Sequence, residues 1–183
     1  PEKAKRLLDE AGHQDPDGPG PAKRFTLTYK TSQNELRRRI GEAIQGLLGE
    51  VGIDVKMRSY EWGTFFSDIR KGNFQIFTLT WVGITAPDIY YYLFHSKSIP
   101  PDGANRGTYL NPEMDLLIER GRVLEDWEER KEVYGRIQKI LARDLPYVSL
   151  WNEVNVVVTD PRIRGFVLRP DGDFLSLKDV WIE

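Results

Sequence analysis

The chain has no cysteine among its 183 residues, which excludes disulfide bonds, zinc–thiolate sites and thiol nucleophiles. It has only two histidines, His13 and His95, and they lack the spacing to each other or to carboxylates that metal and general-base sites need. Charge of one sign is not in excess either, because 26 basic and 28 acidic residues give a net charge of −2. We therefore expect no catalytic residue, no metal, no cofactor and no nucleic-acid partner.

Long hydrophobic runs are also missing. The uncharged run at residues 74–87 is too short and too polar to span a bilayer, so we expect no transmembrane segment in this chain. The sequence begins with Pro1, and the charged residues that follow lead straight into Leu7 and Leu8 rather than into a signal-peptide core. We interpret the chain as an internal fragment of a longer protein, with any targeting signal upstream.

What is present indicates a soluble α/β domain, since 40% of the residues are hydrophobic and 30% are charged. Residues 25–30 and 53–58 alternate apolar and polar side chains, as half-buried strands do, and Phe77, Leu79 and Trp81 continue this pattern in a third strand. Between the strands, apolar residues recur at helical spacing, and residues 32–35 form a capping box that starts the first of these helices. This order predicts a parallel βαβαβ core.

The rest of the chain changes character twice. Residues 12–21 form a Pro/Gly-rich loop after a short terminal helix, and residues 82–110 form a long loop with an aromatic segment inside it. Two helices follow, capped by Asn111 and Asp126, and Pro146 stops the second. Residues 147–183 are strand-rich, with β-type runs at 154–159, 163–168 and 174–177.

The candidate binding residues lie just before the long loop and within it. Trp81 falls at the carboxyl end of a predicted parallel strand, where open α/β sheets bind ligands, although it could simply fill the core. Asn105, Arg106 and Tyr109 offer an amide, a guanidinium and a phenol that could form a polar clamp. The alternative is a turn held by hydrogen bonds from side chains to the backbone. Asp88 supplies a carboxylate in the same loop.

A series of short segments carries a resemblance that extends over nearly the whole chain. The segments are residues 4–12, 44–45, 51–55 and 80–81, then Asn105, residues 109–115, Arg130, Tyr134, residues 137–138 and residues 144–146. In their order and spacing they resemble the family 5 extracellular solute-binding proteins, which include the dipeptide, oligopeptide and nickel receptors of ABC importers.

The resemblance implies a type II periplasmic-binding-protein-like fold. Residues 1–146 would form the C-terminal substrate-binding lobe of a two-lobed receptor, and residues 147–183 would return toward the other lobe, which this chain lacks. The implied function is capture of a peptide or other small solute for import, with a membrane permease as partner and no enzymatic activity. The implied location is periplasmic or extracellular, and a lipoprotein anchor would lie outside the fragment.

The resemblance also assigns contacts to the candidate residues. Trp81 would form an apolar wall, Asn105 and Arg106 polar contacts, Tyr109 a hydroxyl contact and Asp88 a partner for a cation. Peptide-binding members carry an aspartate for the peptide's amino group three residues after the tryptophan, where this chain has Ile84. Ile84 suits a less cationic ligand.

Two other functions remain open from the residues alone. One is an α/β hydrolase or transferase that uses carboxylates such as Asp88 as acid–base groups. The other is a non-catalytic sensory or interaction domain that uses the same lobe.

Overall fold

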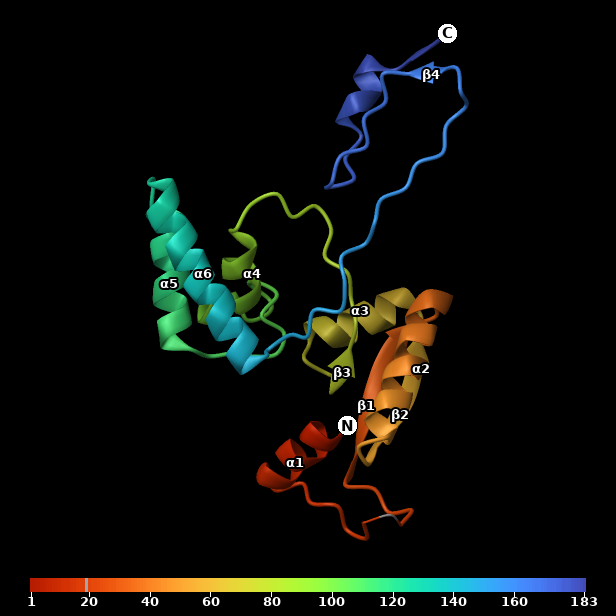
Figure 1. Ribbon diagram of the computed structural model, residues 1–183, viewed down its shortest axis with the longest axis vertical. Helices are drawn as coiled ribbons and strands as arrows, with labels where there is room; N and C mark the ends of the chain where they lie inside the picture. The colour runs from red at the N-terminus through yellow and green to blue at the C-terminus, as the bar shows by residue number, and fades with distance from the viewer. Residues whose placement is uncertain (19) are drawn as a thin grey trace. The chain divides into compact units, whose positions relative to one another are not determined.

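The computed structural model describes residues 1–18 and 20–183 (Figure 1). The predicted loop at residues 12–21 includes Pro19, which lies outside the described residues. The chain divides into two compact units, Pro1–Leu79 and Thr80–Glu183. Each unit has its own buried cluster of apolar side chains, so each is described separately.

The first unit contains the predicted βαβαβ core. After helix α1 (Glu2–Glu10), its elements are β1 (Phe25–Ser32), α2 (Glu35–Gly49), β2 (Ile53–Tyr60), α3 (Trp62–Arg70) and β3 (Ile76–Phe77). The strands pair in the order β2-β1-β3, and both pairings are parallel, as the alternation of strands and helices predicts. The α/β fold class is therefore confirmed.

Helices lie on both faces of this small sheet. Gly41 of α2 is close to the Tyr29 ring of β1 and to the Met57 side chain of β2, so α2 packs on the face that carries Tyr29. On the opposite face, the Lys30 ammonium of β1 forms an ion pair of 2.7 Å with Asp68 of α3. Apart from Lys30 and its neighbours at the strand end, the large buried side chains described in this unit are apolar: Tyr29, Val51, Ile53, Val55, Phe65 and Ile69.

Two local predictions in this unit are wrong in detail. Ser32 is not the helix cap, because β1 extends through Ser32 and the Asn34 side chain accepts the hydrogen bond from the Arg37 N–H. The third strand ends at Phe77 and does not reach Trp81, since among the described residues β3 pairs only with Tyr29 and Lys30 of β1. The boundary between the two units follows shortly after, at Leu79.

The second unit is built on three helices. They are α4 (Ile89–Phe94), α5 (Pro112–Val123) and α6 (Trp127–Asp144), with a short 3-10 turn, η1 (Ser96–Ser98), after α4. The predicted caps are confirmed: Asn111 accepts from the Met114 N–H, and Asp126 accepts from the Glu129 N–H. The helices share one buried cluster: Leu93, Phe94, Ala104, Met114, Leu117, Ile118, Val133, Tyr134, Ile137 and Ile140.

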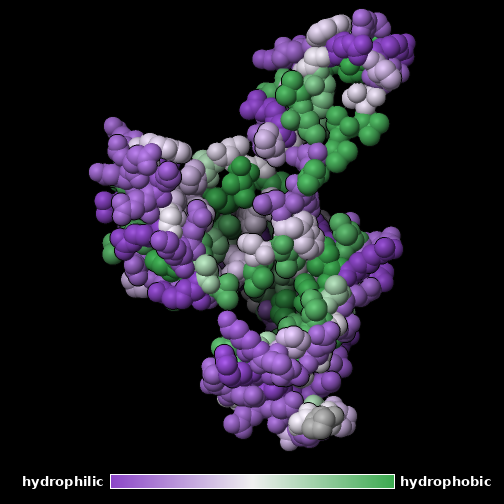
Figure 2. Space-filling view, in the orientation of Figure 1, coloured by the Kyte–Doolittle hydropathy of each residue, from purple (hydrophilic) through white to green (hydrophobic). Residues whose placement is uncertain are grey.

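The tail is less regular than its sequence predicts. It contains β4 (Ile163–Arg164) and β5 (Trp181–Ile182), which pair antiparallel, and the 3-10 segment η2 (Leu175–Asp179). Residues 154–159 lie outside every strand in the described part of the chain. A strand needs a partner for its N–H and C=O groups, and no described segment supplies one here. Figure 2 shows hydrophobic residues gathered along this tail.

Candidate functional site

Trp81 and Arg106, two of the predicted site residues, are brought together in the second unit. Trp81 lies four residues beyond β3, in a segment without regular structure, and is half-buried against the helical cluster. Its indole meets the Tyr92 ring edge-on at 6.1 Å, and the Arg106 guanidinium lies 5.1 Å from the centre of the indole ring. This distance is within the range of a cation–π interaction.

Asn105 uses its side chain to organise the loop rather than to face solvent. The side chain is buried, its Nδ2 donates to the carbonyls of Tyr109 and His95, and its Oδ1 accepts from the Tyr109 N–H. Both amide donors are therefore engaged by backbone carbonyls. For Asn105 the contacts correspond to the turn interpretation.

Tyr109 is held by an acid that the sequence analysis did not select. Its hydroxyl donates a hydrogen bond of 2.6 Å to Oδ2 of Asp144. The Asn111 side-chain amide donates both to the Tyr109 hydroxyl oxygen and to Oδ2 of Asp144, each at 3.0 Å. Burial, and then the hydrogen bond to Asp144, raise the pKa of Tyr109 to about 12. Hydrogen bonds from Arg143 and then from Tyr109 lower the pKa of Asp144 to about 2. At neutral pH the phenol is therefore a donor and the carboxylate an acceptor.

Asp88 is exposed at the start of α4 and is paired with a cation. Its Oδ1 lies 2.6 Å from Nε of Arg122 on α5, and the Arg122 guanidinium lies 4.1 Å from the centre of the Tyr91 ring. The Asp88 charge is thus already balanced within the unit. An acid–base role for this carboxylate would require breaking that ion pair first.

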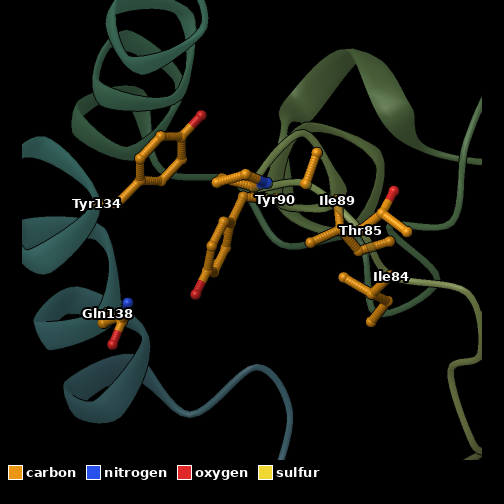
Figure 3. Close-up of a pocket in the computed structure, with 8 residues that line it drawn as sticks. Ile84, Thr85, Ile89, Tyr90, Tyr134 and Gln138 are labelled. Atoms are coloured by element: carbon orange, nitrogen blue, oxygen red, sulfur yellow. The ribbon is translucent and has the colours of Figure 1, made fainter. Parts of the chain in front are cut away.

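A shallow cavity of about 360 Å³ lies beside the loop that follows Trp81 (Figure 3). In it, the Tyr90 and Tyr134 rings lie 5.6 Å apart, and the Tyr90 hydroxyl is hydrogen-bonded to the Gln138 side chain. None of the lining residues is charged. They are Ile84, Thr85, Ala86, Pro87, Ile89, Tyr90, Tyr134 and Gln138. The cavity therefore suits an uncharged, apolar group.

The loop that carries Arg106 has a strained backbone position. Thr108 has a φ of 54°, which is rare for a β-branched side chain, and its N–H donates to the Asn105 carbonyl in a tight turn. Such a position costs free energy and persists only where surrounding contacts impose it. Here those contacts come from Asn105 and Tyr109.

The residues that the sequence analysis missed are Asp144, Arg122 and Tyr92. Asp144 lies in one of the segments that carry the resemblance, and it also occupies the last position of a helix, where the helix dipole disfavours a carboxylate. A residue that violates a local preference is a candidate for a tertiary role. Arg122 and Tyr92 carry no comparable signal.

The histidines do not form a metal site in the described residues. His95 is buried, accepts from the Lys97 N–H through Nδ1 and lies 3.2 Å from Glu119, while the His13 ring contacts Phe25. No group of three or more potential metal ligands occurs in the described part of the chain. None of the described helices combines the length and the apolar character needed to cross a membrane.

Comparison with known proteins gives consistent matches. The family model described as "Bacterial extracellular solute-binding proteins, family 5 Middle" matches residues 1–100. The chain is 31% identical to the oligopeptide-binding protein AppA of Bacillus subtilis and 26% identical to the dipeptide-binding protein of Escherichia coli. The matches cover 98% and 94% of this chain but 34% and 32% of those proteins. The chain thus spans about a third of the length of these relatives.

Solved structures agree with the fold. The structure of AppA from B. subtilis in complex with a nonapeptide matches with a TM-score of 0.80 and 28% identity, over 100% of this chain and 37% of that one. HbpA2 from Haemophilus parasuis matches with a TM-score of 0.81 and 26% identity, over 100% of this chain and 35% of that one. Both alignments include the tail.

Proposed function

Because the chain belongs to the family 5 bacterial extracellular solute-binding proteins, we propose that it is part of the substrate-binding component of an ABC importer. In this role it captures a peptide or another small solute outside the cytoplasmic membrane and delivers it to a membrane permease. The family description is extracellular, and the curated relatives include proteins named as periplasmic.

The observation that carries this proposal is the Trp81–Arg106 pair. Trp81 lies at the start of a long loop of the second unit, and long loops in compact domains are commonly functional. Arg106 places a cationic group against the indole, and the uncharged cavity lies beside the same loop. The pair offers an aromatic wall and a positive charge to a small solute, and the cavity, which neither Trp81 nor Arg106 lines, offers an apolar recess in the same unit.

Of the five predicted residues, we propose that some contact the ligand directly and that others support the loop. Trp81 and Arg106 are the contacts that we favour, since their side chains meet and Trp81 is only half-buried. Asp88 would contact a cationic ligand group only by exchanging Arg122 for it. Asn105 and Tyr109 would act mainly through the loop that they hold, because their polar atoms are already bonded.

Two observations bear on the ligand class: the names of the relatives, and the residue Ile84, which differs from the aspartate of peptide-binding members. Relatives are named for oligopeptides, dipeptides and heme, so a peptide is the first candidate. The resemblance implies that Ile84, which is half-exposed, occupies the position where peptide-binding members carry the amine-binding aspartate. A ligand without a free ammonium group at this position, such as a modified peptide, therefore fits better than an unmodified one.

The domain arrangement is part of the same proposal. Residues 1–146 would supply the C-terminal lobe, and residues 147–183 would return to a second lobe. The tail supports this because Val154, Val156 and Val158 are 85%, 79% and 92% exposed, and Val157 on the other face of the run is 44% exposed. A β-type run that is apolar on both faces is typical of a strand buried inside a sheet.

The test uses the intact protein. Native mass spectrometry of the purified protein would identify a co-purified solute, and calorimetry with a defined pool of N-acetylated and free tri- to nonapeptides would measure binding. Trp81→Ala should weaken binding at least about tenfold, whereas Trp127→Ala, an exposed residue at the start of α6, should not. Equal affinity in wild type and Trp81→Ala would remove Trp81 from the site, and binding of no solute or peptide would contradict the proposed function.

A further inference from the structure

Asp144 is a carboxylate at a helix position that disfavours negative charge. It is the last residue of α6, where the carbonyl end of the helix dipole disfavours a negative charge. Three donors offset this cost: the Tyr109 hydroxyl, the Asn111 amide and the Arg143 guanidinium. Arg143 is the neighbouring residue, but Tyr109 and Asn111 come from the segment that leads into α5. The carboxylate therefore joins the end of one helix to the start of another.

Through Tyr109, Asp144 is also linked to the loop that carries Arg106. Tyr109 is tied at its hydroxyl to Asp144 and at its backbone to the Asn105 amide, which holds both the Tyr109 N–H and its carbonyl. Asn105 in turn donates to the His95 carbonyl after α4. Residues 105–109 are thus fixed at both ends.

The attachments hold the backbone of Thr108 in a conformation that threonine disfavours. Thr108 lies between the two fixed points with a φ of 54°. This left-handed region is unfavourable for an L-residue, because it brings the Cβ close to the following carbonyl oxygen. Loss of these attachments would favour a negative φ at Thr108, and Arg106 is only two residues away from that position.

We infer that Asp144 is a positioning residue of the ligand site: by holding the Tyr109 hydroxyl, it keeps residues 105–109 in the turn that places the Arg106 guanidinium against Trp81. This inference rests on the proposed function only in calling the Trp81–Arg106 pair a ligand site. The positioning itself is a property of the unliganded protein. The competing view is that Asp144 only ties α6 to the start of α5.

The experiment labels the intact protein with 5-fluorotryptophan and follows the Trp81 resonance by ¹⁹F NMR without ligand, with Trp81→Phe assigning the signal. Arg106→Gln defines where the resonance lies when the guanidinium is absent. Tyr109→Phe and Asp144→Ala should both move the resonance toward the Arg106→Gln position. Tyr109→Phe removes only a hydroxyl, so it keeps the test valid where Asp144→Ala fails to fold.

Glu113→Gln is the matched control. Glu113 is an exposed acid of α5 that pairs with Arg136 of α6 at 3.1 Å, so it also links the two helices, and it is not among the residues that hydrogen-bond residues 105–109 in the described part of the chain. Its replacement should leave the Trp81 resonance in place. A Trp81 resonance unchanged in Tyr109→Phe, or shifted equally in Glu113→Gln, would overturn the inference and leave Asp144 with a helix-tying role.

Binding supplies a second readout that separates this inference from the proposed function. Measured with the same peptide pool, Tyr109→Phe should bind roughly 3- to 30-fold more weakly than wild type, the range typical of positioning residues that do not touch the ligand. If wild type binds no peptide, the proposed function fails while the ¹⁹F result still decides the positioning role. If Tyr109→Phe binds as wild type does although its resonance has moved, the pair is positioned by Asp144 but is not the ligand site.

Discussion

The Tyr109 hydroxyl and the Asp144 carboxylate, 35 residues apart in the chain, form a hydrogen bond of 2.6 Å that joins the segment before α5 to the end of α6. Because the pKa of Tyr109 is raised to about 12 and that of Asp144 is lowered to about 2, neither group titrates near neutral pH. The bond is therefore insensitive to the pH changes that a protein outside the cell commonly meets.

Acid should weaken this bond in a defined window. The folded-state pKa of Asp144 lies below the ordinary aspartate value of about 4, so its ionised form stabilises the fold above about pH 4. That contribution is lost as the pH falls toward the folded-state pKa of about 2. The melting temperature of wild type should thus fall more steeply between about pH 4 and pH 2 than that of Asp144→Asn, which cannot titrate. Parallel melting profiles would contradict the assignment.

Two glycines of α2 should respond oppositely to alanine. A Cβ at Gly41 would lie 2.6 Å from the Met57 methyl and 2.7 Å from the Tyr29 ring, so Gly41→Ala should lower the free energy of unfolding by about 1–3 kcal/mol. Gly46 has nothing within 4 Å of such an atom, and Gly46→Ala should raise it by about 0.5–1 kcal/mol. Urea denaturation of the intact protein measures both, and a change of the same sign in both would show that α2 does not pack on Tyr29 as described.

Relief of the strained turn should stabilise the second unit. Thr108→Gly removes the Cβ that disfavours a φ of 54°, so we expect a gain of about 1 kcal/mol in the free energy of unfolding. Thr85→Gly is the control, because Thr85 lies in an exposed loop and is not among the residues with positive φ. It should gain nothing. A loss of stability in Thr108→Gly would mean that the threonine side chain itself supports the loop.

Removing a hydroxyl should have opposite effects at two tyrosines. The Tyr134 hydroxyl is buried against Gly121 and has no hydrogen-bond partner among the described residues, so Tyr134→Phe should keep or raise stability, by up to about 1–3 kcal/mol. Tyr109→Phe loses a hydrogen bond to a charged group and should lower the free energy of unfolding. The two midpoints of urea denaturation can be compared directly. A marked loss in Tyr134→Phe would reveal a partner for that hydroxyl, such as a bound water.

The parallel core could be predicted from sequence because its evidence is local. Alternation at residues 25–30 and 53–58 and helical spacing between them set the element types, and chain connectivity then makes the pairing parallel. The cap at Asn34 was missed because Ser32 offers the same capping chemistry two residues earlier. Only the length of β1, which is set by its pairing with β2, decides between them.

The site was predictable only in part. Position at a strand end pointed to Trp81, and loop chemistry pointed to Arg106, and the two side chains do meet. The pairs Asp88–Arg122 and Tyr109–Asp144 are long-range contacts, and sequence spacing holds no information on which distant charge a side chain will reach. The roles of these residues in binding remain predictions.

The uncovered valines of the tail have a consequence for handling the protein. Residues 154–158 contain four valines and no charge, with backbone groups that no described strand pairs. In a preparation of this chain alone, such a segment would serve as a template for intermolecular β-pairing, so solubility would fall with protein concentration. Glu153 and Asp160 bracket the run and act as charged gatekeepers, because like charges stacked in register would repel as an aggregate grows.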